Sequence, residues 1–412
     1  MEKTLIEWEN QAAANRSALD DLVTQGAQRM LQAALEAEVA DYVNRHQLVC
    51  DKNGRRQVVR NGKLPKRTVL TGAGALQVEQ PRVNDKRSGK KFTSSILPPY
   101  MRKSPTLEKL IPVLYLKGIS TGQFGEALEA ILGPGAGGLS ATSVTRLIQE
   151  WQKDYQAWNS RDLSDKEYVY WWADGIYFNV RLEDERTCIL VLMGTLKDGR
   201  KELIGIVDGF RESKLSWQDL LRGLKTRGLQ DGAKLAVGDG ALGFWAALRE
   251  EFPMTVEQRC WVHKTANVLN KMPKGVQARA KERLHDIFMA ESRVDANIAF
   301  SEFKNLYAAK YPKAWECLEK DRDVLLAYYD FPAEHWVHIR STNPIESTFA
   351  TVRHRTRRTK GNATRKATLA MVFQLCREAE RHWHRIRGYK LIIKLYMEDI
   401  VFVDGIEQKR SA

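Results

Sequence analysis

The strongest constraint on the fold is a series of apolar runs between residues 168 and 259. Three of them, "YVYWWADGIYFNV", "TCILVLMGT" and "KELIGIVDG", follow one another with short polar segments between them, as in an antiparallel meander. The helical segment "SKLSWQDLLRGLKTRGL" then leads to a fourth run, "KLAVGD", and the helix "GALGFWAALREEF" leads to a fifth, "MTVEQRC". We therefore expect an α/β domain built around five strands.

Two of these runs carry an aspartate that is followed by glycine, and we expect Asp174 to end the first strand and Asp239 to end the fourth. A carboxylate beside buried strand positions is costly to keep ionised unless another charge offsets it. Each aspartate alone is also explained as a turn former or a helix cap. A meander, a helix and a fourth strand are, however, the order of the ribonuclease-H-like fold, whose first and fourth strands are neighbours. The two carboxylates would then face each other and need a cation between them.

A third carboxylate is expected from a helix that follows the fifth strand. Glu346 in "STNPIESTFATVRHRTRRTKG" qualifies, because Asn343 is a good cap, Pro344 suits the first helical position and Glu346 then lies in the first turn. The alternative is that an early glutamate only complements the helix dipole. The same helix continues with five basic residues that are suited to hold phosphates, Arg353, Arg355, Arg357, Arg358 and Lys360.

The charge balance points to a polyanionic partner, and to nucleic acid before an anionic membrane. The 412 residues include 65 Lys and Arg against 51 Asp and Glu, a formal net charge of +14. Residues 51–104 hold fourteen of these basic residues and three acidic ones. Residues 340–390 hold thirteen basic residues and three acidic ones. A single basic run is often only a solvated surface, but two separate runs favour nucleic acid. No apolar run is long enough for a membrane span or a signal peptide, so we expect a cytoplasmic protein.

The N-terminal third divides into three segments. Residues 1–46 have helical spacing, residues 47–103 form a basic β-rich module, and residues 104–160 return to helix in pieces. In the last of these, Ser140 is a plausible cap, and Thr142, Ser143 and Arg146 near the helix start fit a helix-turn-helix reader of DNA. The expected contacts in the basic module are Arg55, Arg56 and Arg60. A packing ribbon and a helical hairpin without DNA are the alternatives.

Beyond the strands, residues 264–340 show no strand pattern and are expected to form an all-helical insertion domain. It would divide the core into a first part, residues 161–263, and a second part, residues 341–412, with the glutamate helix and C-terminal helices. A long unstructured connection between Asp239 and Glu346 would be improbable in a compact domain. Trp261 and Trp336 flank the insertion and either pack in the core or stack on an unpaired base.

Over nearly its whole length the chain resembles the bacterial transposases of the Mutator-like insertion-sequence family. The stretches that carry the resemblance are "ADGIYFNVRLE", "LIGIVDGFRESKLSWQDLL", "AVGDGALGFWAAL", "QRCWVHKTANVLNKMPK", "YYDFPAEHWVHIRSTNPIESTFATVRHRT" and "TKGNATRKATLAMVF". The resemblance implies a DDE transposase in which Asp174, Asp239 and Glu346 hold two divalent ions, Mg²⁺ or Mn²⁺. Two such ions suit in-line displacement at phosphorus.

The resemblance also implies partners and a pathway. The DNA would be the terminal inverted repeats of the element and its target, and joining two ends suggests a homodimer associated with the bacterial nucleoid. One strand would be nicked at one end of the element and joined to the other end, so that the element is copied out as a circle. The circle would then be pasted into the target DNA. Two alternatives stay open: a transposase-derived DNA-binding regulator that joins no strands, and a structure-specific nuclease on the same fold.

Cys260 and His263, three residues apart after the fifth strand, form half of a zinc site. His285, Cys317, His335 or His338 would have to complete it, but their spacing matches no finger. The family carries this pair as a regular motif near the active site, so a structural or DNA-positioning role is the favoured interpretation. A Cys-His nucleophile is the rival enzyme hypothesis, and no oxyanion-hole glycine motif accompanies it.

Overall fold

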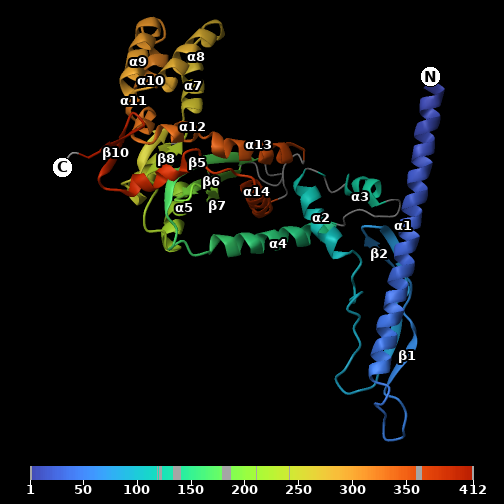
Figure 1. The fold of residues 1–412 in the computed structure, drawn as a ribbon. Helices are drawn as coiled ribbons and strands as arrows, with labels where there is room; N and C mark the ends of the chain where they lie inside the picture. The colour runs from blue at the N-terminus through green and yellow to red at the C-terminus, as the bar shows by residue number, and fades with distance from the viewer. Residues whose placement is uncertain are drawn as a thin grey trace. The chain divides into compact units, whose positions relative to one another are not determined.

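The computed structural model describes residues 2–117, 119, 123–132, 141–178, 187–209, 211–240, 242–358 and 364–410 (Figure 1). Side chains are also left out of the description at residues 2–17, 131–132, 141–142, 187, 242, 351 and 354–358. The chain forms two units, residues 1–145 and residues 146–412, which we call the N-terminal unit and the C-terminal unit. No helix among the described residues is both long enough and apolar enough to cross a membrane.

The N-terminal unit begins with the long helix α1, Glu2–Arg45, which packs against two short antiparallel ladders. Their strands are β1 Val58–Lys63, β2 Arg67–Thr71, β3 Gly74–Val78 and β4 Pro81–Asp85, paired β1 with β4 and β2 with β3. Leu35 of α1 meets Val69, Leu76, Val78 and Leu97 in a buried cluster. Apolar residues on β2 and β3 thus cover one face of α1.

Three helices follow: α2 Pro105–Leu116, α3 Phe124–Leu132 and α4 Ala141–Asn159. Pro105 occupies the first helical position of α2, where its missing N–H costs nothing. Leu107, Phe124 and Leu128 pack with Leu70 of β2 in a second buried cluster, so α2 and α3 also pack on this ladder. Ser140 and the turn "PGAGG" lie outside the described residues, and so does the Thr142 side chain. The helix-turn-helix reader therefore stays a prediction.

The C-terminal unit contains a five-stranded mixed sheet in the order β7-β6-β5-β8-β9. β5 is antiparallel to β6, which is antiparallel to β7, whereas β8 is parallel to both β5 and β9. The first and fourth strands are therefore neighbours, as the sequence predicts. The strands are β5 Tyr168–Phe178, β6 Thr187–Leu196, β7 Lys201–Gly209, β8 Leu235–Gly238 and β9 Val256–Arg259.

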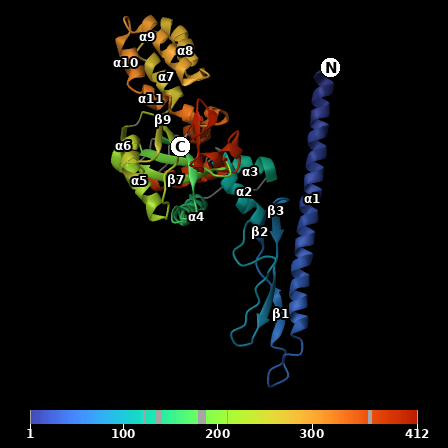
Figure 2. The ribbon, with the colours of Figure 1, turned by 60° about the vertical axis from the view of Figure 1, so that its left-hand side comes forward.

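Both faces of β5 are buried, which explains its continuous apolar sequence. Trp171 and Ala173 point into a cluster with the helices α5, Lys214–Thr226, and α6, Leu242–Glu251, which lie side by side (Figure 2). Tyr170 and Trp172 alternate to the other face. The Tyr170 hydroxyl lies 2.6 Å from His335 Nδ1, and Trp172 Nε1 donates to the His338 carbonyl at 3.0 Å.

Residues 264–340 are all described and contain helices and no strand, as predicted. A buried ion pair ties this segment together, since Lys264 of α7 donates to Asp321 and to the Cys317 carbonyl. Figures 1 and 2 show α7 to α10 grouped together. The elements are α7 Trp261–Leu269, α8 Lys274–Met289, α9 Arg293–Tyr307, α10 Pro312–Glu319, α11 Arg322–Leu325, η2 Ala327–Asp330, η3 Ala333–His335 and α12 Trp336–Ile339.

The chain ends with α13 Asn343–Arg358, α14 Arg365–Glu380, η4 Tyr389–Tyr396 and the hairpin of β10 Ile400–Val403 with β11 Ile406–Lys409. The hairpin corrects the expectation that only helices follow Glu346. Its turn residues Asp404 and Gly405 both have positive φ, which is the conformation that Asp-Gly favours between two strands. The turn packs against the helical segment, because Ala333 N donates to the Gly405 carbonyl at 3.1 Å.

Candidate active site

Asp174 and Asp239 lie where the pairing of β5 with β8 stops. The last paired residues are Ala173 of β5 and Gly238 of β8. Asp174 and Asp239 each come directly after one of them. Asp239 follows the end of β8, as predicted. The prediction that Asp174 ends its strand is wrong: β5 continues to Phe178, because "IYF" still pairs with β6. Asp174 is therefore held by a ladder on one side and has no strand beside it on the other.

The glycine after each aspartate orients the carboxylate. Gly175 N donates to Asp174 Oδ1 at 2.8 Å, and Gly240 N donates to Asp239 Oδ1. Trp245 Nε1 of α6 donates to the Asp239 carbonyl at 2.8 Å, which fixes the backbone there. One oxygen of each carboxylate thus has a defined N–H partner.

Glu346 lies in the first turn of α13, which packs on β5. The prediction that Asn343 caps this helix is wrong, because α13 already includes Asn343 and the preceding residue is Thr342. The Thr342 carbonyl accepts from Glu346 N at 3.0 Å, and its hydroxyl donates to Glu346 Oε1 at 2.8 Å. Thr342 therefore fixes both the backbone and the carboxylate of Glu346.

Cys260 and His263 join this group from the start of α7. Cys260, only 1% exposed, accepts from Thr342 N through its sulfur at 3.3 Å. His263 Nδ1 lies 3.4 Å from Thr342 Oγ1 and 3.7 Å from Glu346 Oε1. The cysteine-histidine pair thus meets the start of α13 through Thr342, and a thiol buried in this way is poorly placed to act as a nucleophile.

His263 is positively charged at neutral pH. Its hydrogen bond with the Cys260 side chain, followed by attraction to Asp239 and Asp174, raises its pKa to about 9 although burial opposes this. Its neighbour Glu346 is close enough to form an ion pair. Asp174 and Asp239 thus act on the charge of His263, and Glu346 lies next to it.

Among the carboxylates of this site, Asp174 has a strongly raised pKa. Burial raises its pKa to about 7, and the nearby charges of Glu212 and Glu346 add to that shift. The Gly175 N–H and His263 act in the opposite direction. Asp174 is thus half-protonated near neutral pH, and a bound cation would stabilise its ionised form.

Glu212 is a fourth carboxylate at the site, which sequence reasoning did not single out. It lies in the connection between β7 and α5, and a Cβ added to Gly175 would come within 2.5 Å of its Oε1. A Cβ at Gly243 in α6 would overlap its carbonyl oxygen. Burial and the charge of Asp239 raise its pKa. The two glycines leave room for Glu212 beside Asp174, but a glutamate in a loop carries no signal of that in a single sequence.

The donors at the site fall into two sets. Carboxylate oxygens from Asp174, Asp239 and Glu346 are the ligands that Mg²⁺ and Mn²⁺ prefer. Among the described residues, the donor atoms that lie within 4.8 Å of one another are those of Cys260, His263 and Glu346, a mixed set that would suit zinc. Cys260 is already bonded to Thr342, however, and a protonated His263 offers no lone pair. By ligand type, the oxygen set therefore suits a hard divalent ion better than the mixed set.

The three histidines that the sequence offered for zinc have partners elsewhere. His335 Nε2 lies 3.0 Å from the Gly388 carbonyl, His338 Nε2 accepts from Arg387 N, and the His285 ring packs edge-on against Phe288. Trp261 and Trp336 are buried, and each donates its Nε1 hydrogen to a backbone carbonyl. The core-packing interpretation of both tryptophans is confirmed.

The basic residues proposed to contact DNA have different surroundings. Arg55 and Arg56 are exposed, but Arg60 is paired with Glu36 at 2.7 Å. Arg146 lies near Glu150 at 3.8 Å, and Arg353 is exposed on α13. Arg355, Arg357 and Arg358 belong to α13, with side chains outside the description, and Lys360 lies outside the described residues.

The site thus combines two aspartates from a mixed α/β sheet with a glutamate at the start of a helix that carries basic residues. Comparison with known proteins gives the family. Residues 1–386 match the model of the Mutator family of transposases, and the chain belongs to that family.

Two relatives are about half identical to this chain. The transposase for insertion sequence element IS6120 of Mycolicibacterium smegmatis is 51% identical over 286 residues, covering 69% of this chain and 88% of the relative. The transposase for IST2 of Acidithiobacillus ferrooxidans is 49% identical over 68% of this chain and 95% of its own length. A third relative, the transposase for IS256 in transposon Tn4001 of Staphylococcus aureus, is 28% identical over 85% of this chain and 88% of its own length.

Proposed function

We propose that this chain is a DNA transposase of the DDE type, with Asp174, Asp239 and Glu346 as the catalytic carboxylates. The observation that carries the proposal is geometric: Asp174 and Asp239 directly follow the last paired residues of β5 and β8, and Glu346 lies in the first turn of the helix that packs on β5. Family membership and the names of the relatives support the activity. The strand order β7-β6-β5-β8-β9 supports a ribonuclease-H-like core, with residues 264–340 as its helical insertion.

Asp174, Asp239 and Glu346 would hold two divalent ions, Mg²⁺ or Mn²⁺. When bound, such ions activate the attacking oxygen and stabilise the leaving oxygen of an in-line displacement at phosphorus. The protein's own contribution is orientation. Gly175 and Gly240 direct one oxygen of each aspartate through their N–H groups, and Thr342 directs Glu346. Outer groups of this kind fix the ligands of a metal site.

The substrates would be the ends of the insertion sequence and its target, as double-stranded DNA. Copying out a circle and pasting it in fits this site, because one set of carboxylates serves both nicking and joining. A homodimer would bring the two ends together. The net charge of +14 supports binding to a polyanion.

The test is an assay of the purified protein on duplexes that carry the end of its own element, with Mg²⁺ or Mn²⁺. The expected products are a nick at the end and a joined strand, and both should disappear when the three carboxylates are replaced singly. Binding without either product would favour the regulator. Cutting without joining, on branched substrates, would favour the nuclease.

A further inference from the structure

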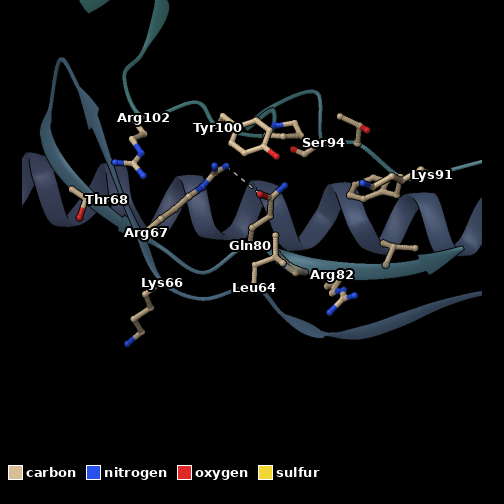
Figure 3. A pocket seen from close by; sticks show the side chains of 15 residues that line it. Leu64, Lys66, Arg67, Thr68, Gln80, Arg82, Lys91, Ser94, Tyr100 and Arg102 are labelled. Carbon is tan, nitrogen blue, oxygen red and sulfur yellow. Dashed lines mark hydrogen bonds between the residues drawn. The ribbon is translucent and has the colours of Figure 1, made fainter. Parts of the chain in front are cut away.

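The N-terminal unit contains a cavity of about 980 Å³ between the strand ladders and the segment 91–102 (Figure 3). Fifteen residues line it, and none of them is acidic. Five carry a positive charge: Lys66, Arg67, Arg82, Lys91 and Arg102. A cavity that is lined by several cations and by no carboxylate has a positive electrostatic potential, which favours the binding of an anion.

The wall of the cavity is fixed at both ends. Glu38 of α1 accepts hydrogen bonds from Ser95 N at 2.7 Å and from the hydroxyls of Ser94 and Ser95. At the other end, Leu70 N donates to the Arg102 carbonyl at 2.8 Å, which joins the segment to the edge of β2. The hollow is therefore built by defined contacts and is not a gap beside a loose loop.

Arg67 lies in this hollow without an acidic partner. Its Nη2 donates to Gln80 Oε1 at 3.2 Å and to the carbonyls of Leu97 and Pro98 at 3.4 and 3.3 Å. Burial, and then the charge of Arg102, lower its pKa. The acceptors that orient the guanidinium are neutral. They compensate neither its positive charge nor its repulsion by Arg102.

The remaining cations separate into two kinds. Lys66 is paired with Glu79 at 3.5 Å and points away from the other labelled side chains in Figure 3. Arg82, Lys91 and Arg102 are exposed, and within the described part of the chain no carboxylate pairs with them. Four of the five cations are therefore available to a ligand.

Tyr100 stands beside Arg67 at the rim of the cavity (Figure 3). Its side chain is 94% exposed and its φ is 67°, a left-handed conformation that is strained for a bulky residue. The turn that holds it is closed by Met101 N donating to the Pro98 carbonyl, the carbonyl that Arg67 also binds. The structure thus presents an aromatic ring to solvent beside unpaired guanidinium groups.

We propose that this cavity grips the sugar-phosphate backbone of double-stranded DNA, with Tyr100 against a sugar or a base edge. Arg67 and Arg102 would contact one phosphate, and Arg82 and Lys91 would contact its neighbours along the strand. The proposal rests on the proposed function and specifies which surface of the N-terminal unit holds the DNA. It moves the expected contact away from Arg60, whose charge is already paired with Glu36.

The first test compares two double variants of the full chain that remove equal charge. Arg82→Gln with Arg102→Gln removes two cavity cations, and Arg60→Gln with Lys66→Gln removes two paired cations from the same module. Each phosphate contact contributes about 0.9 units of log–log salt dependence, so the cavity variant should bind a short duplex about 50-fold more weakly at 0.1 M salt. The control should change less than about threefold. Equal losses in both would overturn the proposal.

A second test needs no substitution in the cavity. Acetylation of surface amines should slow at Lys91 when duplex DNA is bound and stay unchanged at Lys66. Equal protection of both lysines, or of neither, would contradict the proposal. Inorganic phosphate at matched ionic strength should protect neither, because protection by phosphate alone would make this a small-anion site. Duplex RNA bound as tightly as DNA would overturn the assignment of the partner.

Tyr100→Ala should weaken duplex binding about tenfold without changing the salt slope, since a ring adds contact but no charge. An unchanged affinity would remove Tyr100 from the surface. Failure of the cavity variants to lose affinity, while the unmodified chain still nicks its own ends, would reject this inference and leave the proposed function standing. Absence of any nicking by the unmodified chain would reject the proposed function.

Discussion

Two carboxylates, one in each unit, have pKa values that are shifted in opposite directions. In the N-terminal unit, Asp85 has a side chain only 2% exposed, yet Arg87 and then Tyr42 donate hydrogen bonds to it and hold its pKa well below its usual range. In the C-terminal unit, burial and neighbouring carboxylates raise the pKa of Asp174 to about 7. One acid is fully satisfied by its own chain, and the other is not.

This difference distinguishes a structural carboxylate from a functional one more clearly than burial does. Both residues lie in β-structure next to apolar neighbours. A structural ion pair stabilises the ionised form within the folded chain. A group whose charged form lacks compensation is suited to bind a ligand of opposite charge, and the same logic applies with reversed sign to Arg67 in the cavity. The following predictions test this contrast in order of decreasing effect on strand cleavage.

The largest effect is expected from removing a carboxylate of the proposed triad. Asp174→Ala, Asp239→Ala and Glu346→Ala should each lower nicking by about a thousandfold or more, because metal ions contribute several kcal/mol to such reactions. Binding to the ends should persist, since the cavity lies in the other unit. The check is a cleavage assay with parallel binding curves, and strand transfer by any of the three variants would contradict the assignment.

Glu212→Gln should reduce cleavage less, by about 10- to 100-fold, as expected for a group beside the metal ligands. A matched control is Glu250→Gln, because Glu250 pairs with Lys214 at the surface of the same unit. Gly175→Ala should resemble Glu212→Gln, since its methyl group would displace the Glu212 carboxylate. Full activity of both Glu212→Gln and Gly175→Ala would show that Glu212 is a bystander.

The apparent affinity for Mg²⁺ should depend on pH in two steps. Asp174 must lose its proton to bind a cation, so affinity should rise about tenfold per unit as the pH approaches about 7. His263 loses its positive charge near pH 9, and a second, smaller rise is expected there. Calorimetric titration of the full chain would measure both. In Asp174→Asn the lower step should be absent, and its survival would mean that another group produces it.

Asp85→Asn should leave cleavage of bound DNA unchanged and act only on stability. Losing the bond between Asp85 and Arg87 should cost about 2 kcal/mol of local unfolding free energy in the N-terminal unit. Because the pKa of Asp85 is lowered on folding, its contribution is present above about pH 4 and is lost as the pH falls. Hydrogen exchange at β1 and β4 is the readout, and slower cleavage of bound DNA would argue against a purely structural role.

Much of the fold follows from the sequence because the apolar runs are long and bounded. Strands from Tyr168 to Arg259 lie where their patterns predict them, and the helices between β9 and α13 are recognisable from their spacing. The extent of β5 beyond Asp174 was not predictable, since a carboxylate and a glycine normally end a strand. Pairing of Ile176 with Ile189 on β6 overrides that local signal.

The site was predictable only in part. Asp174 is marked by the apolar run that it interrupts, Asp239 by its position after a strand, and Glu346 by its position at a helix start. Thr342 and Glu212 are ordinary polar residues, and their importance arises from three-dimensional proximity. For Glu212, that proximity depends on two glycines that are distant in sequence, Gly175 and Gly243. The cavity shows the same limit, because sequence counts cations but does not reveal which of them an acid such as Glu36 or Glu79 already neutralises.

The turn of the C-terminal hairpin has a consequence for the protein during its own synthesis. Asp404 Oδ1 accepts from Arg293 N, and Gly405 bonds to Tyr329 and Ala333, so the helical segment between β9 and α13 is held in part by residues that are made much later. The N-terminal unit leaves the ribosome far earlier and has its own core. A nascent chain can therefore complete the cavity before residues 404 and 405 have been made, and with them the contacts that the hairpin turn gives the helical segment.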